Sequence, residues 1–111
     1  MTESHPGWIA VEDGATVDHT GSEGGVIWKD EEHADGARIT LERNSLMGAP
    51  FALTCGIYGW MVHTRFFADE PTALAQYDAM KPVLAEIAGL VISERSSEAA
   101  DAIDVFAATF P

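Results

Sequence analysis

Two polar side chains stand out in the least charged part of the sequence, His63 and Arg65. The alternation of a β-strand would place both on one face, together with Met61 and Phe67. An arginine can grip a carboxylate or a phosphate, and a histidine can move a proton near neutral pH. One hypothesis is therefore an anion-binding or acid–base site. In the competing interpretation, both side chains face solvent or Arg65 pairs with a nearby acid.

An acidic stretch from Asp30 to Gly36 is the second candidate, because Glu31 and His33 would share a strand face there. Hard cations prefer clustered carboxylates. The spacing matches neither an EF-hand loop nor a zinc site with two histidines, so we expect a solvated hairpin tip and no metal. Phosphate-loop, dinucleotide-binding and nucleophile-elbow motifs are also missing from the sequence, and we expect no cofactor.

Cys55, Tyr58 and Trp60 complete the residues that could do chemistry. Cys55 is the only cysteine, and we expect it in the core of a protein from a reducing compartment, not as a nucleophile. Exposed aromatic side chains on a sheet make good interface anchors. We therefore group Tyr58 and Trp60 with His63 and Arg65 as candidate ligand-binding residues; packing in the core is the alternative for both aromatics.

Charge is distributed very unevenly along the chain. Of its 111 residues, eighteen are acidic and six are basic, which gives a net charge of −12. Residues 1–44 contain ten acids and three bases, and residues 69–111 contain eight acids and two bases. Between them, Arg65 is the only charged residue of the segment 45–68. We expect this charge-poor segment to form the interior of a sheet.

This charge excludes some classes of partner. Nucleic acids and anionic membranes are bound through lysine and arginine, which release counterions from phosphates, so neither is expected. A basic protein partner remains possible. The N-terminus lacks the basic start and apolar run of a signal peptide, and no apolar stretch reaches the roughly 20 residues that cross a bilayer. We expect a soluble cytoplasmic protein.

Aromatic and β-branched residues dominate residues 51–67. One strand of this length would extend roughly 55 Å, too long for a domain with a radius of gyration near ~13 Å. Gly56 and Gly59 allow the chain to turn. The sequence therefore predicts two strands, about 51–56 and 60–67, with one bent strand as the alternative.

A second hairpin is predicted from residues 26–32 and 37–43, which flank an Asp-Gly turn signal. A two-residue turn would pair Trp28 with Arg43, whereas a four-residue loop would pair Trp28 with Leu41. We favour the longer loop, because it gathers Val26, Trp28, Ile39 and Leu41 on one buried side. The acids of this hairpin would then line the solvent side. A short strand is also expected within residues 7–12.

Helical periodicity begins after Ala68. Asp69 is a plausible N-cap, Pro82 should kink the first helix, and residues 90–92 form either its last turn, which we favour, or a short edge strand. Ser96 or Ser97 is expected to cap a final helix that buries a stripe of apolar residues. The predicted fold is a single α+β domain over residues 1–111. It has an antiparallel meander of four or five strands followed by two helices on one face, with residues 1–6 poorly ordered.

Three functions fit these features. The first is a non-enzymatic protein-interaction module, with a homodimer as one form of it, because the sequence shows no catalytic set. The second is a small anion-binding protein or small enzyme that uses His63 and Arg65. The third is an acidic inhibitor or immunity-type protein for a basic partner, which requires the acids of residues 30–35 and 98–104 to cluster on one surface.

Overall fold

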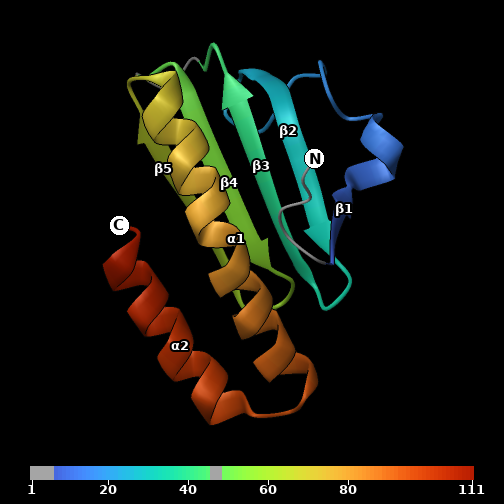
Figure 1. Ribbon diagram of the computed structural model, residues 1–111, viewed down its shortest axis with the longest axis vertical. Coiled ribbons are helices and arrows are strands. Elements are labelled where there is room, and N and C mark those ends of the chain that lie inside the picture. Colours follow the sequence, from blue (N-terminus) through green and yellow to red (C-terminus); the bar gives the residue numbers. More distant parts are fainter. Residues whose placement is uncertain (1–6, 46–48) are drawn as a thin grey trace.

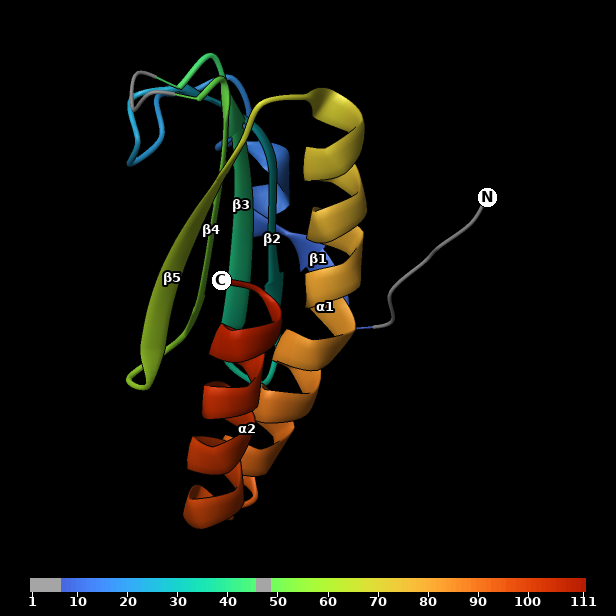
Figure 2. The ribbon, with the colours of Figure 1, turned by 90° about the vertical axis from the view of Figure 1, so that its left-hand side faces the viewer.

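The structure, a computed structural model, describes residues 7–45 and 49–111 and has two layers. Five antiparallel strands follow one another across a sheet in the order β1-β2-β3-β4-β5, and two helices cover one face of it (Figures 1 and 2). The strands are β1 (Trp8–Ala10), β2 (Val26–His33), β3 (Ala37–Arg43), β4 (Phe51–Ile57) and β5 (Met61–Phe67). A 3₁₀ turn, η1 (Val11–Gly14), follows β1, and the helices are α1 (Glu70–Ile92) and α2 (Ser96–Thr109). The predicted α+β meander is confirmed.

Over most of its length, the β2–β3 hairpin has neither of the two predicted registers; only Val26 and Ile27, which pair with Arg43 and Glu42, keep the register of the four-residue loop. His33 pairs with Ala37, so the loop has three residues instead of two or four. The predicted pairing of Trp28 with Leu41 is therefore wrong. Gly36 has a φ of +110°, which glycine adopts without steric cost, and this conformation lets the chain reverse within three residues.

A β-bulge in β2 changes which of its side chains point toward the helices. The register shifts between Ile27 and Lys29, so that the intervening Trp28 lies at the irregularity. Trp28 then packs against the core cluster that contains Ile39 and Leu41, as the sequence predicted. The prediction was right that Trp28, Ile39 and Leu41 pack together and wrong about the pairing that brings them there; Val26, the fourth residue of the predicted face, is half-buried and lies outside this cluster.

The apolar segment 51–67 forms a regular hairpin. Phe51 pairs with Phe67 and Ile57 with Met61, with no irregularity between them. The predicted pair of strands and the turn around Gly59 are confirmed to within one residue.

Helix α1 begins and ends as predicted. Asp69 caps it by accepting a hydrogen bond from the Thr72 N–H at 2.9 Å. The helix continues through Pro82 to Ile92, so residues 90–92 form its last turn. The predicted serine cap of α2 is wrong: Arg95 occupies the N-cap position and Ser96 is the first helical residue. Within residues 7–45 and 49–111, neither helix combines the length and the hydrophobicity that a bilayer crossing requires.

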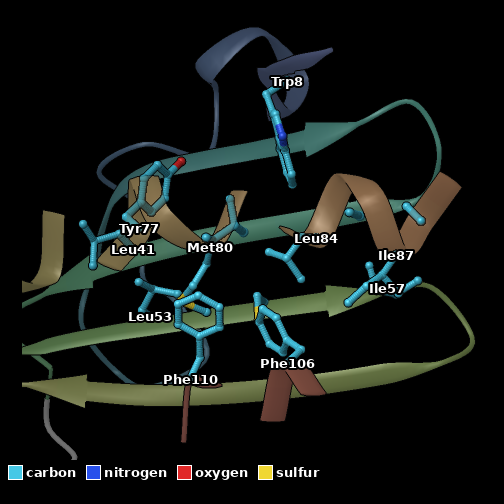
Figure 3. Packing of buried hydrophobic residues seen from close by; sticks show 14 of the residues in the cluster. Trp8, Leu41, Leu53, Ile57, Tyr77, Met80, Leu84, Ile87, Phe106 and Phe110 are labelled. Atoms are coloured by element: carbon cyan, nitrogen blue, oxygen red, sulfur yellow. The ribbon is translucent and has the colours of Figure 1, made fainter. Parts of the chain in front are cut away.

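The core fills the space between the sheet and the helices (Figure 3). The helix-facing side chains of β3 and β4 meet a stripe from α1, and Phe106 and Phe110 close the cluster from α2. Its fully buried members include Ile39, Leu41, Leu53, Ile57, Tyr77, Met80, Leu84, Ile87 and Phe106.

Only half of the charge-poor segment lies in the interior of the sheet. β4 is flanked by strands on both sides, and its Leu53 and Ile57 are buried. β5 is an edge strand, and its Val62 and Phe66 are 80% and 42% exposed. The expectation that the whole segment would be interior is wrong for β5, because the helices cover only one of its faces.

Candidate functional site

The structure places His63 and Arg65 on the helix side of β5, where both bind the end of the chain. The Nε2 atom of His63 lies 2.6 Å from the Phe110 carbonyl oxygen, and Arg65 Nε donates to the Pro111 carbonyl oxygen at 3.0 Å. A second guanidinium nitrogen of Arg65 donates to Gln76 Oε1 at 2.6 Å. The contacts with Phe110 and Pro111 hold the residues that follow α2 against β5, and the contact with Gln76 connects β5 to α1.

Aromatic rings surround the same pair. The Arg65 guanidinium carbon lies 4.9 Å from the Phe67 ring centroid and 5.4 Å from that of Phe110. The His63 ring meets the Phe106 ring edge-on at 6.2 Å between centroids. Burial lowers the pKa of Arg65. The two side chains are thus joined to the packing between β5 and α2, and Arg65 has protein carbonyls as partners where an anion was one hypothesis.

Tyr58 and Trp60 lie elsewhere, in the turn between β4 and β5. Both line a hollow of about 690 Å³ on the sheet face that the helices leave uncovered. The β4–β5 turn and the loop of residues 18–25 project on this side of the sheet (Figure 2). His63 and Arg65 do not line the hollow, so the four candidate residues fall into two separate pairs.

A row of polar side chains crosses the uncovered face at paired positions: Asp30, Thr40, Thr54 and Thr64. Thr40 donates to the Asp30 carboxylate at 2.9 Å, and the hydroxyls of Thr54 and Thr64 lie 3.2 Å apart. Arg38 donates to both carboxylate oxygens of Asp30, at 3.0 and 2.7 Å, and this contact raises the pKa of Arg38. The Asp30 carboxylate is fully buried, so its charge is neutralised within the protein.

Glu42 joins this face to the loop of residues 18–25. Its carboxylate is buried and accepts hydrogen bonds from the backbone N–H groups of Glu23 and Gly25, the latter at 2.9 Å. Gly21 lies so close to the Glu42 carboxylate that a side chain there would collide with it. The loop is therefore held as one wall of the hollow, and Thr20, Gly21 and Ser22 line it.

Comparison with known proteins adds no relative. No protein-family model, curated protein or solved structure matches this chain.

Under α1 lies a buried polar cluster that the sequence did not reveal. Glu31 accepts hydrogen bonds from Tyr77 Oη at 2.5 Å and Lys81 Nζ at 2.6 Å. Burial and the contact with Glu31 raise the pKa of Tyr77, which therefore stays protonated and donates. Lys81 is buried and its ammonium also lies 5.6 Å from the Trp8 ring centroid. The cluster attaches α1 to β2.

These contacts correct the expectation that the acids of β2 and β3 line the solvent side. Asp30 and Glu42 are only 3% and 1% exposed, and Glu31 faces α1. Sequence alternation alone could not distinguish them from solvated acids, because it does not show which side chains or backbone N–H groups lie opposite each carboxylate. The Glu31–Lys81 pair is separated by fifty residues.

Neither Cys55 nor the acidic loop offers a reactive or metal-binding group. Cys55 is buried, and burial raises the pKa of its thiol to about 12, which suppresses the thiolate. Among residues 7–45 and 49–111, histidine, cysteine and carboxylate side chains form no group of three that could hold a metal ion.

The most unusual surface feature is a group of large apolar side chains on the β4–β5 hairpin. We define the hairpin patch as Tyr58, Trp60, Val62 and Phe66, all of which are exposed. Val62 and Phe66 alternate with His63 and Arg65 along β5 and therefore point to the uncovered face. The sequence analysis missed Val62 and Phe66, although strand alternation with His63 and Arg65 could have found them.

Proposed function

We propose that this chain is a non-enzymatic protein-interaction module that forms a homodimer through its hairpin patch. The polar groups in the described part of the chain mostly bind one another, whereas the patch offers apolar area with no partner in the fold. Cys55, the single cysteine, fits the reducing cytoplasm in which we place the protein.

One observation carries the proposal: four large apolar side chains are exposed on one hairpin. Single exposed apolar residues are ordinary, but grouped ones with a shared face are typical of interaction sites. Tyrosine, tryptophan and phenylalanine are also enriched in the cores of interfaces, where charged residues are depleted. Residues 49–68 contain only one charged side chain, Arg65, which binds the chain's own carbonyl groups.

The charge distribution favours this surface over others for contact between two copies. A molecule of net charge −12 repels its copy, and the repulsion is weakest where no acid is present. The segment 45–68 contains no acid at all. Two copies therefore meet with the least electrostatic cost at the β4–β5 hairpin.

The proposal is tested by placing a charge in the hairpin patch. Val62→Glu should weaken self-association at least tenfold, because burying an unpaired carboxylate is costly. Ile9→Glu is the matched control: Ile9 is 63% exposed on the opposite edge of the sheet, and the substitution adds the same charge. Light scattering coupled to size-exclusion chromatography measures both. A wild-type chain that keeps the mass of one copy, 11.9 kDa, at millimolar concentration overturns the proposed dimer.

The hollow supports a second function, the binding of a small ligand. Its volume lies within the roughly 300–1,000 Å³ of known ligand sites, and Tyr58 and Trp60 line it. This moves the small-ligand hypothesis from His63 and Arg65 to the other face. A ligand whose binding is lost in Trp60→Ala, without any change in mass, would favour this function over the first.

An acidic inhibitor for a basic partner has less support. That function needs free acids in residues 30–35, and Asp30 and Glu31 already bind Arg38, Tyr77 and Lys81. The exposed acids of α2, Asp101 and Asp104, remain for such a partner.

A further inference from the structure

Strand β5 is an edge strand without the usual features that prevent edge-to-edge pairing. Such edges are normally shortened, bulged or protected by lysine and proline. β5 has seven residues, pairs with β4 without a bulge, and contains neither lysine nor proline. Its one charged residue, Arg65, is turned to the helix side and bound there. The other edge, β1, has only three residues.

We infer that two copies of this chain pair antiparallel along β5, with a twofold axis between their Thr64 residues, into one continuous ten-stranded sheet. The inference rests on the proposed function and specifies the geometry of that dimer. A twofold axis places residue i opposite residue j and j opposite i. Thr64 is the midpoint of β5, so this centre pairs all seven residues of each strand. Moving the centre by one residue leaves two residues of each strand unpaired.

The side chains of β5 are self-complementary about this centre. Val62 of each copy lies opposite Phe66 of the other, and the two Thr64 residues face each other between these apolar pairs. Pairs of an aromatic and a β-branched residue across strands stabilise antiparallel sheets. Val62 and Phe66 are the exposed apolar side chains of β5, so the same pairing brings the exposed apolar side chains of the two strands into contact with each other.

The polar row of the uncovered face continues through the axis. Thr40 pairs with Thr54 and Thr54 with Thr64, whose hydroxyls already lie within hydrogen-bonding distance of each other. In the dimer, Thr64 of the second copy continues this row. The hydroxyl of each Thr64 then lies beside another hydroxyl and not beside an apolar side chain. The twofold axis is perpendicular to the sheet. The helices of both copies therefore lie on one side of the ten-stranded sheet, and the two uncovered faces form its other side.

A second copy fits this edge better than an unrelated extended segment for two reasons. The full seven-residue overlap and the apolar pairing both follow from β5 meeting itself. β5 also contains no acid, so no carboxylate of one β5 strand lies opposite a carboxylate of the other. An extended segment of another protein on this edge would leave the purified chain monomeric, so light scattering distinguishes that outcome from the β5 dimer.

Cysteine cross-linking tests the register. Directly opposed residues of antiparallel strands have Cα atoms about 4.5–5.5 Å apart, within the range of a disulfide. Thr64→Cys should therefore give a disulfide-linked dimer under mild oxidation by oxidised glutathione, seen on non-reducing gels. Val62→Cys alone should give at least tenfold less, because the two Val62 residues are offset by four positions, roughly 13 Å. The wild-type chain is the control, since its only cysteine, Cys55, is buried.

A mixture of Val62→Cys and Phe66→Cys chains provides an independent arm. The mixture should form disulfide-linked mixed dimers, whereas each variant alone should not. This result does not depend on whether Thr64→Cys folds. A wild-type dimer by light scattering in which neither arm cross-links overturns the β5 pairing and leaves the proposed interaction module in place. A monomer at every concentration overturns both.

Discussion

At the scale of single residues, carboxylates that look like surface acids in the sequence are structural groups in the fold. Glu42 holds a loop through backbone N–H groups, Asp30 neutralises Arg38, and Glu31 neutralises Lys81 under α1. Removing one partner of such a pair leaves an uncompensated buried charge, which costs more than the pair contributes when intact. Asp30 and Lys81 are the most sensitive to such a loss, since their side chains are only 0% and 5% accessible.

A double-mutant cycle tests the Glu31–Lys81 pair. Glu31→Gln should lower the free energy of unfolding at pH 7 by about 2 kcal/mol, because the Lys81 ammonium stays buried without its counter-charge. Lys81→Met should also destabilise, and the double variant should recover to within about 1 kcal/mol of wild type. Urea unfolding measures all three. Strictly additive losses would show that the two side chains do not interact.

The same carboxylate predicts a pH dependence. Burial opposes its ionisation, yet the hydrogen bonds from Lys81 and Tyr77 outweigh this effect and hold the pKa of Glu31 below its usual value of 4.5. The unfolded state therefore takes up the proton first as the pH falls. The stabilisation by Glu31 is complete above pH 4.5 and is lost as the pH falls through the folded-state pKa. Glu31→Gln should flatten the loss of stability in this range, and an unchanged acid limb would contradict the assignment.

At the scale of elements, β5 connects the two layers through one face and leaves the other bare. His63 and Arg65 tie it to the end of α2, whereas Val62 and Phe66 project from the uncovered sheet. The two pairs explain why a strand so rich in aromatic residues lies at an edge: half of its side chains serve the fold and the other half remain available. The predicted anion-binding pair, His63 and Arg65, and two residues of the hairpin patch, Val62 and Phe66, lie on opposite faces of this one strand.

A comparison of two arginines tests this structural role. Arg65→Ala should lower the free energy of unfolding by about 1–2 kcal/mol, because it removes the hydrogen bonds to Pro111 and Gln76. Arg95→Ala is the control on α2, where the ion pair with Glu98 is more than half exposed and should contribute about 0.5 kcal/mol or less. If urea unfolding shows that both substitutions lower the free energy of unfolding by the same amount, Arg65 does not hold the end of α2 against β5.

At the scale of the whole molecule, the sequence predicted the elements and missed the long-range partners. Periodicity and turn chemistry were sufficient for the meander, the β4–β5 hairpin and the Asp69 cap, because each depends on neighbours in the chain. The register of β2 and β3 was wrong because a three-residue loop and a bulge at Trp28 have no distinctive sequence signal. The site residues divided between two faces because the sequence did not predict that β5 is an edge strand whose other face stays bare.

Hydrogen exchange at two protein concentrations tests the central claim, that the edge of β5 is where this chain meets its partner. The account predicts that backbone amides of Met61–Phe67 exchange more slowly as the concentration rises, because the strand gains a neighbour, while those of Trp8–Ala10 at the other edge do not change. Exchange in β5 that is as fast at millimolar as at low micromolar concentration would contradict it.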